Sequence, residues 1–274
     1  MSRLRGAESE AGRIRSGVLA WVKRMPNEVI VERAGPVGIV TLNRPRVHNA
    51  INSPMLEAMH AALVEFDRDD AIKAVVFTGA GKLAFSAGAD IKEQADTAPR
   101  SELWRSWAWD MATYRKPTIG ALNGLVYGGA AQMALTLDIR IGCERTSFRF
   151  LYAAMGRIVG TWILPLVVGW SRATELLITA RVVESEEAYR IGLLHHLVPG
   201  DRLLEKAVET GELIAKNHAA SVQGIKTLLR EHVGLSLEAM YRSEIESRES
   251  RFPSVPFTEA FREFLTKKEP PTSN

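Results

Sequence analysis

The chain has 274 residues, of which 46% are hydrophobic, so it can form one large hydrophobic core or two smaller ones. Its formal net charge is only +3 and its basic residues are spread along the sequence, which argues against a nucleic-acid partner. With a single cysteine, no signal-peptide pattern and no apolar run of about 20 residues, we expect a cytoplasmic protein without a membrane span.

The N-terminal part of the chain predicts an extension followed by a hairpin and a helix. Residues 1–27 are rich in arginine, and we expect them to form a flexible extension. Two β-branched runs, 29–34 and 37–42, flank Gly35-Pro36 and predict a β-hairpin. Ser53-Pro54 then predicts the start of a helix, with the serine as N-cap and the proline in the first turn.

Strand and helix patterns alternate through the middle of the chain. The segments 74–79, 118–122 and 138–142 predict strands, and the first is apolar throughout, which is typical of a strand covered on both faces. This alternation predicts an α/β core over residues 28–169, built from repeated β-β-α or β-α units. From Ser171 onward only helical periods remain, at 173–178, 185–191, 203–229 and 235–268. We therefore expect a helical region over residues 170–274, with the boundary near Gly169.

Two glycine-bearing turns carry the strongest functional signal. One spans residues 85–92 (FSAGADIK) and the other spans residues 123–132 (NGLVYGGAAQ). Each is typical of a turn that presents backbone N–H groups to a pocket, and two such turns can bind one oxygen atom that becomes negative during a reaction. Together they predict an oxyanion hole.

The two turns, in this order, resemble those of the crotonase superfamily, also called the enoyl-CoA hydratase/isomerase family. The resemblance covers residues 28–270 and is most specific in Leu42-Asn43-Arg44-Pro45, in the turns and in residues 188–199. It implies a crotonase-like spiral of repeated β-β-α units, followed by an all-helical C-terminal region that covers the site and makes oligomer contacts. It also implies an acyl-CoA ligand and a homotrimer or a dimer of trimers.

The resemblance assigns roles to individual positions. The thioester oxygen would accept hydrogen bonds from the backbone N–H groups of Ala89 and Gly129. Coenzyme A enters as part of the substrate, and neither a resident cofactor nor a metal is expected. The positions that would contact coenzyme A are Arg46, Val47, Ala50, Ala87, Asp90, Ile91 and Lys92, with Phe264 and Lys267 in the last helix.

The chain departs from the family at the two positions where its hydratases carry glutamates. Gln132 occupies the first position, and the spacing from Phe148 to Gly156 places Tyr152 at the second. Glutamine does not ionise, and tyrosine, with an ordinary pKa near ~10, is a weak base at neutral pH. We expect Glu93, beside the first turn, to be an acid at a helix terminus. This pattern does not favour hydration by a pair of carboxylates.

Two interpretations follow, and both keep Gln132 and Tyr152 as candidate site residues. In the first, which we favour, the protein is an acyl-CoA enzyme that stabilises an enolate during isomerisation, decarboxylation, thioester hydrolysis or residual hydration. In the second, it is a non-catalytic acyl-CoA-binding protein. A nucleotide-binding module is not favoured, because the sequence lacks both G-x-G-x-x-G and the P-loop pattern.

Overall fold

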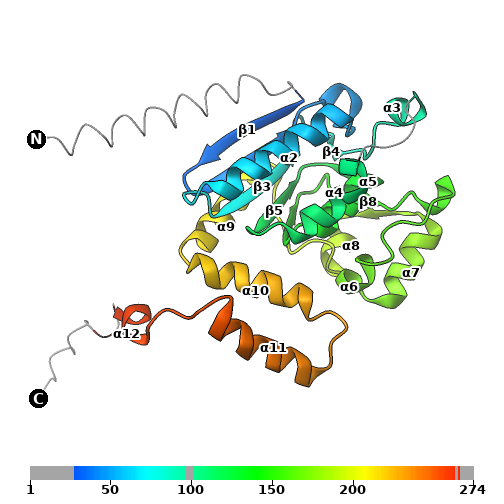
Figure 1. Cartoon of the computed structure of the whole chain (residues 1–274). Coiled ribbons are helices and arrows are strands. Elements are labelled where there is room, and N and C mark those ends of the chain that lie inside the picture. Colours follow the sequence, from blue (N-terminus) through cyan, green and yellow to red (C-terminus); the bar gives the residue numbers. More distant parts are fainter. Residues whose placement is uncertain (1–27, 97–101, 263–264, 266–274) are drawn as a thin grey trace, which may run out of the picture. The chain divides into compact units, whose positions relative to one another are not determined.

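The computed structural model describes residues 28–96, 102–262 and 265 (Figure 1). Contacts divide the chain into two compact units, one that extends to Lys216 and one that begins at Asn217. The extension predicted for residues 1–27 lies outside the described residues. All described strands belong to the first unit, and the described elements of the second unit are helices.

A six-stranded sheet forms the centre of the first unit in the described part of the chain. In spatial order its strands are β1 (Val29–Ala34), β2 (Val37–Leu42), β3 (Ala74–Gly79), β5 (Thr118–Leu122), β7 (Ile139–Gly142) and β10 (His196–Leu197). The strands β1 and β2 form the predicted antiparallel hairpin, whereas the other neighbours pair in parallel. Every residue of β3 is buried, as its predominantly apolar sequence predicted.

A second, smaller sheet lies beside the first and positions the site. Its described strands, in spatial order, are β4 (Ala84–Ser86), β6 (Leu125–Tyr127), β8 (Ser147–Arg149) and β9 (Val182–Glu184). The chain alternates between the sheets, because β3, β5 and β7 of the first sheet are followed by β4, β6 and β8 of the second. The strands β4, β6 and β8 pair in parallel, so the segments that follow them leave the sheet at the same edge.

Helices pack against both faces of the six-stranded sheet (Figure 1). On one face, α2 (Ser53–Arg68) contributes Met55 and Phe66 to a hydrophobic cluster that includes Phe77. On the other face, α9 (Leu203–Ala215) contributes Leu203 and Ala207 to a separate cluster with β3 and β5. The remaining helical elements of this unit are η1 (Pro45–Val47), α3 (Ile91–Asp96), α4 (Glu102–Thr113), α5 (Gly129–Thr136), η2 (Ala153–Met155), α6 (Leu164–Val168), α7 (Trp170–Thr179) and α8 (Ser185–Arg190).

The α/β class and the helical C-terminal region are confirmed, but the region after Gly169 is not all-helical. The strands β9 and β10 lie there and pair with β8 and β7. They were missed because three and two residues are too few to show an alternating pattern. Through α9 the chain still packs on the central sheet, and the compact units divide only after Lys216. The predicted domain boundary near Gly169 stays a prediction.

Helix ends also differ from the sequence prediction. The N-cap of α2 is Asn52, whose side-chain oxygen accepts a hydrogen bond from the Met55 N–H at 3.1 Å, so the cap lies one residue before the predicted serine. The predicted helix 203–229 is two helices, α9 and α10 (Ala219–Glu231). The predicted helix 235–268 is interrupted after α11 (Leu237–Ser250), because Pro253 and Pro256 precede the short α12 (Phe257–Ala260).

Candidate functional site

The two glycine turns lie side by side, because the strands before them, β4 and β6, are parallel neighbours. Gly88 marks the closest approach. A Cβ atom placed there would lie 2.7 Å from the Gly129 nitrogen and 2.8 Å from the Tyr127 carbonyl oxygen, and the φ of Gly88 is +94°. A Cβ on Gly129 would in turn lie 3.4 Å from the Ala89 nitrogen. The predicted pair of N–H donors is therefore brought together in space.

Neither the Ala89 N–H nor the Gly129 N–H donates a hydrogen bond to an acceptor within the described residues. Gly129 begins α5, and the first N–H groups of a helix have no partner inside it. Ala89 forms a parallel bridge with Ile51, in which Gly88 O accepts at 2.7 Å and Asp90 N donates at 2.8 Å. This alternation turns the N–H of Ala89 itself away from Ile51. Both donors are thus available for an oxygen atom of a ligand.

Two of the segments predicted to contact coenzyme A also meet. The loop through η1 lies against the first turn, because the Ala87 N–H donates to the His48 carbonyl at 2.9 Å and Ile51 bonds to Gly88 as above. The side chains of Arg46, Val47, Ile91 and Lys92 are exposed, whereas Ala50 and Ala87 are half-buried. Phe264 and Lys267 lie outside the described residues.

Asp90 has a structural partner that the sequence analysis did not assign. Arg44 donates to its carboxylate at 2.8 Å and to the Ala50 carbonyl at 2.7 Å. Burial pushes the pKa of Asp90 upward, but hydrogen bonds from Arg44 and from the N–H groups of Glu93 and Lys92 outweigh it, so this pKa lies below its ordinary value. The conspicuous Leu42–Pro45 motif was the available signal for Arg44.

Two buried asparagines hold the backbone beneath the turns, and sequence reasoning missed both. The Asn49 side chain donates to the carbonyls of Ala80 and Ala84 and accepts from the Arg44 N–H. The Asn123 side chain donates to the Gly79 carbonyl at 2.8 Å and accepts from the Gly79 N–H at 3.1 Å. The signal for Asn123 was its place next to a glycine, directly after an apolar strand.

Gln132 and Tyr152, the two residues predicted to depart from the family pattern, lie on segments that follow neighbouring strands. Gln132 is half-buried on α5, and its side-chain amide makes no hydrogen bond with the rest of the described chain. Tyr152 follows β8, and its hydroxyl donates to the Gly128 carbonyl at 2.8 Å. Burial raises the pKa of Tyr152 well above its ordinary value, so the hydroxyl stays protonated at neutral pH.

The carboxylates beside the first turn form hydrogen bonds or ion pairs with other residues of the chain. Glu93 lies in the first turn of α3, as expected for an acid at a helix terminus, and its carboxylate also accepts from the Ser53 N–H at the start of α2, at 3.0 Å. The carboxylate of Asp90 is paired with Arg44. No group of three or more His, Cys, Asp or Glu side chains that could hold a metal occurs in the part of the chain that the structure describes.

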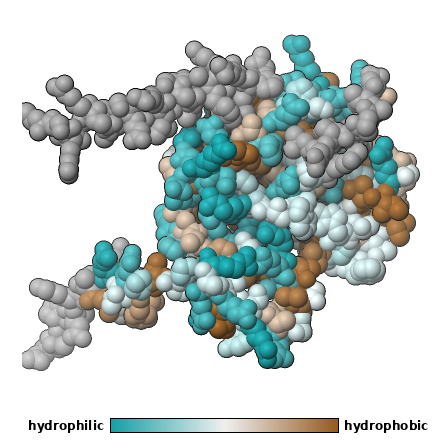
Figure 2. All heavy atoms as spheres, viewed as in Figure 1, coloured by the Kyte–Doolittle hydropathy of each residue, from teal (hydrophilic) through white to brown (hydrophobic). Residues whose placement is uncertain are grey.

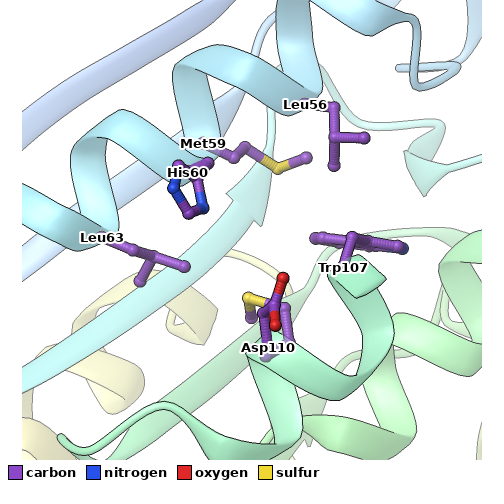
Figure 3. Close-up of a pocket in the computed structure, with 7 residues that line it drawn as sticks. Leu56, Met59, His60, Leu63, Trp107 and Asp110 are labelled. Carbon is purple, nitrogen blue, oxygen red and sulfur yellow. The ribbon is translucent and has the colours of Figure 1, made fainter. Parts of the chain in front are cut away.

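A small cavity between α2 and α4 lies apart from the two turns (Figure 3). Leu56, Met59, His60 and Leu63 approach it from α2, and Trp107, Asp110 and Met111 approach it from α4. Its volume of about 20 Å³ leaves room for a water molecule but not for an acyl group. None of its lining residues belongs to either turn.

None of the helices described is both long enough and apolar enough to cross a lipid bilayer.

Comparisons with known proteins cover most of the chain. The model of a family described as enoyl-CoA hydratase/isomerase matches residues 32–273. The "Probable enoyl-CoA hydratase echA8" of Mycobacterium tuberculosis is 33% identical over 249 residues, which cover 88% of this chain and 96% of that protein. The short-chain-enoyl-CoA hydratase of Clostridium acetobutylicum is 30% identical over 254 residues, with coverages of 88% and 96%. The crystal structure of an enoyl-CoA hydratase from Bacillus anthracis has a TM-score of 0.79 at 30% identity and covers 89% of this chain and 98% of that one.

Proposed function

Because the chain belongs to the enoyl-CoA hydratase/isomerase family, we propose that it is an acyl-CoA enzyme that stabilises a thioester enolate between the N–H groups of Ala89 and Gly129. The observation that carries this proposal is the close approach of these two groups, neither of which bonds to a described acceptor. Fixed backbone donors bind developing negative charge without having to reorganise, and removal of one such donor typically costs about 3–4 kcal/mol.

We further propose that hydration is not the main reaction. Gln132 cannot accept a proton at neutral pH, and the Tyr152 hydroxyl already donates its hydrogen bond to the Gly128 carbonyl. The acids beside the first turn, Asp90 and Glu93, are occupied by Arg44 and Ser53. Loss of carbon dioxide from a thioester whose α carbon carries a carboxylate, such as malonyl-CoA, requires no protein base, because the breaking C–C bond supplies the electron pair of the enolate. Isomerisation, thioester hydrolysis and hydration all require a group that moves a proton or orients water.

The expected ligand contacts and assembly belong to the same proposal. The exposed side chains of Arg46 and Lys92 provide positive charge for the phosphates of coenzyme A, which enters with the substrate. Val47, Ala50, Ala87, Asp90 and Ile91, with Phe264 and Lys267, complete the proposed contacts. We also propose a cytoplasmic homotrimer or dimer of trimers.

Substrate assays on wild type and on Gln132→Glu test this function. Hydration of crotonyl-CoA is followed by loss of its conjugated absorbance, decarboxylation is assayed with malonyl-CoA, and binding of acyl-CoA is measured by calorimetry. We expect wild type to bind acyl-CoA but to hydrate crotonyl-CoA more slowly than ~1 s⁻¹, the lower end of typical turnover numbers. Gln132→Glu supplies one carboxylate and should raise this rate, whereas Gln223→Glu, the same substitution on α10, should not.

Other outcomes separate the alternatives. Hydration by wild type at ~1 to ~1000 s⁻¹ would show that the two glutamates are not needed. Binding of acyl-CoA without turnover of either substrate would favour a non-catalytic acyl-CoA-binding protein. Failure to bind acyl-CoA at all would contradict both interpretations.

A further inference from the structure

The Tyr152 hydroxyl bonds to the same peptide unit that provides one of the two oxyanion donors. Its hydrogen bond ends on the carbonyl oxygen of Gly128, and the other end of that peptide unit is the N–H of Gly129. This carbonyl also accepts from the N–H groups of Ala131 at 2.9 Å and Gln132 at 3.3 Å, at the start of α5. Three donors therefore converge on one carbonyl oxygen.

Bonds to a peptide oxygen change the N–H at the other end of the unit. Amide resonance couples the two ends, so that electron withdrawal at the oxygen makes the N–H a stronger donor. Such cooperative strengthening is estimated at roughly 10–30% per hydrogen bond. The Tyr152 bond thus acts on the Gly129 N–H without any contact between Tyr152 and the ligand.

The orientation of this peptide unit also needs a restraint. Glycine stands on both sides of it, and Gly128 has a φ of +52° and a ψ of −125°, where residues with a side chain are disfavoured. A Gly-Gly peptide can rotate with little steric resistance, and rotation would turn the Gly129 N–H away from Ala89. The phenol, held on the segment after β8, opposes this rotation from the neighbouring strand.

We propose that Tyr152 is a positioning residue that polarises and orients the Gly128–Gly129 peptide, so that the Gly129 N–H binds the thioester oxygen more strongly. This inference rests on the proposed function, because it assumes that the Gly129 N–H meets that oxygen. It assigns Tyr152 no proton transfer, which agrees with its protonated hydroxyl being donated to Gly128.

The carbonyl stretch of a bound thioester tests the inference directly. Butyryl-CoA labelled with ¹³C at its carbonyl is bound to wild type and to Tyr152→Phe, and the stretch is read by isotope-edited infrared difference spectroscopy. We expect wild type to lower the frequency relative to the free thioester. We expect Tyr152→Phe to lose at least about a tenth of that lowering, with little change in Kd. Tyr114→Phe is the matched control, because the Tyr114 hydroxyl donates to the Leu63 carbonyl at 3.1 Å, on α2, and its loss should leave the frequency unchanged.

The outcomes distinguish this inference from the proposed function. If wild type does not lower the carbonyl frequency, the oxyanion hole itself is wrong. If wild type lowers it and Tyr152→Phe lowers it equally, the inference is overturned while the proposed function stands. Replacement of Tyr152 by 3-fluorotyrosine keeps the ring and makes the hydroxyl a stronger donor, so the lowering should exceed that of wild type. An unchanged frequency in this variant would also overturn the inference, even if Tyr152→Phe fails to fold.

Discussion

At the scale of single residues, the proposed site depends on a glycine, a residue that has no side chain. Gly88 allows the two turns to approach, since the atoms nearest to an added Cβ, Gly129 N and Tyr127 O, both belong to the backbone. Backbone atoms cannot rotate aside as the end of a flexible side chain can. A methyl group at Gly88 would therefore separate the turns and with them the N–H groups of Ala89 and Gly129.

We predict that Gly88→Ala reduces kcat/KM for the best acyl-CoA substrate by about 100-fold or more, the loss expected when one oxyanion donor is displaced. Steady-state kinetics provide the measurement. The control is Gly35→Ala in the β1–β2 turn, where φ is also positive, at +56°, but no atom lies within 4 Å of the added Cβ. Both variants should lose stability, by about 1–3 kcal/mol from backbone strain. Near-normal activity of Gly88→Ala would contradict the proposed approach of the turns.

At the scale of elements, one short strand, β10, forms an edge of the central sheet. The strand β10 pairs with β7 over two residues, next to His195. The Arg140 N–H donates to Nδ1 of His195 at 3.1 Å, and the His195 N–H donates to the Arg140 carbonyl at 2.8 Å. Partial burial, together with the charges of Arg140 and His196, lowers the pKa of His195 to about 4. The imidazole is thus neutral in the folded protein at neutral pH.

We predict that this histidine makes folding sensitive to acid. Its folded pKa of about 4 lies below its ordinary value of 6.5, so between these pH values the unfolded chain binds more protons. The free energy of unfolding should therefore fall as the pH drops from 6.5 to 4, with no contribution from His195 to the pH dependence above that window. Urea unfolding at a series of pH values measures the slope. In His195→Asn the slope should be smaller, because the amide oxygen still accepts a hydrogen bond but does not titrate; equal slopes would exclude His195 as the cause.

At the scale of the whole molecule, the first unit exposes large apolar side chains on adjacent helices. Leu166 on α6 is 60% exposed, and Trp170 and Ile178 on α7 are 80% and 70% exposed. Figure 2 shows hydrophobic residues, in brown, on the side of the molecule where α6 and α7 lie. A clustered apolar surface of this kind is typical of a protein–protein interface, and we propose that it contributes to the homotrimer or dimer of trimers.

Light scattering coupled to size exclusion tests this assembly. Wild type should have the mass of a trimer or hexamer, and the double variant Trp170→Arg, Ile178→Arg should have a lower mass, because unpaired charges would be buried in the interface. Ile30→Arg on β1, also an exposed apolar position, serves as the control and should keep the wild-type mass. A monomeric wild type would refute the proposed assembly. An unchanged mass in the double variant would place the interface elsewhere.

Sequence patterns predicted the helices and strands that depend on residue type and spacing over a few neighbouring residues. The hairpin around Gly35-Pro36 and the apolar strand β3 follow from residue type and period, and the structure confirms both. Patterns failed where the signal was short or distant: β9 and β10 are too short to alternate, and the N-cap of α2 moved to Asn52, an equally good cap. The two turns were predicted from their glycines and the roles of their residues from the family resemblance, whereas the contacts of Arg44 and Asn49 were not predicted, because their partners lie far along the chain.

By itself, the sequence determined the α/β order, the two glycine turns and the presence of Gln132 and Tyr152, which the family resemblance predicts to stand where hydratases carry carboxylates. These features depend on the residue types along the chain. Only the tertiary structure decided that the turns meet, that the Ala89 and Gly129 N–H groups lack acceptors among the described residues, and that Tyr152 bonds to Gly128. The physical reason is the parallel pairing of β4, β6 and β8, which places three segments from distant parts of the chain at one edge of a sheet.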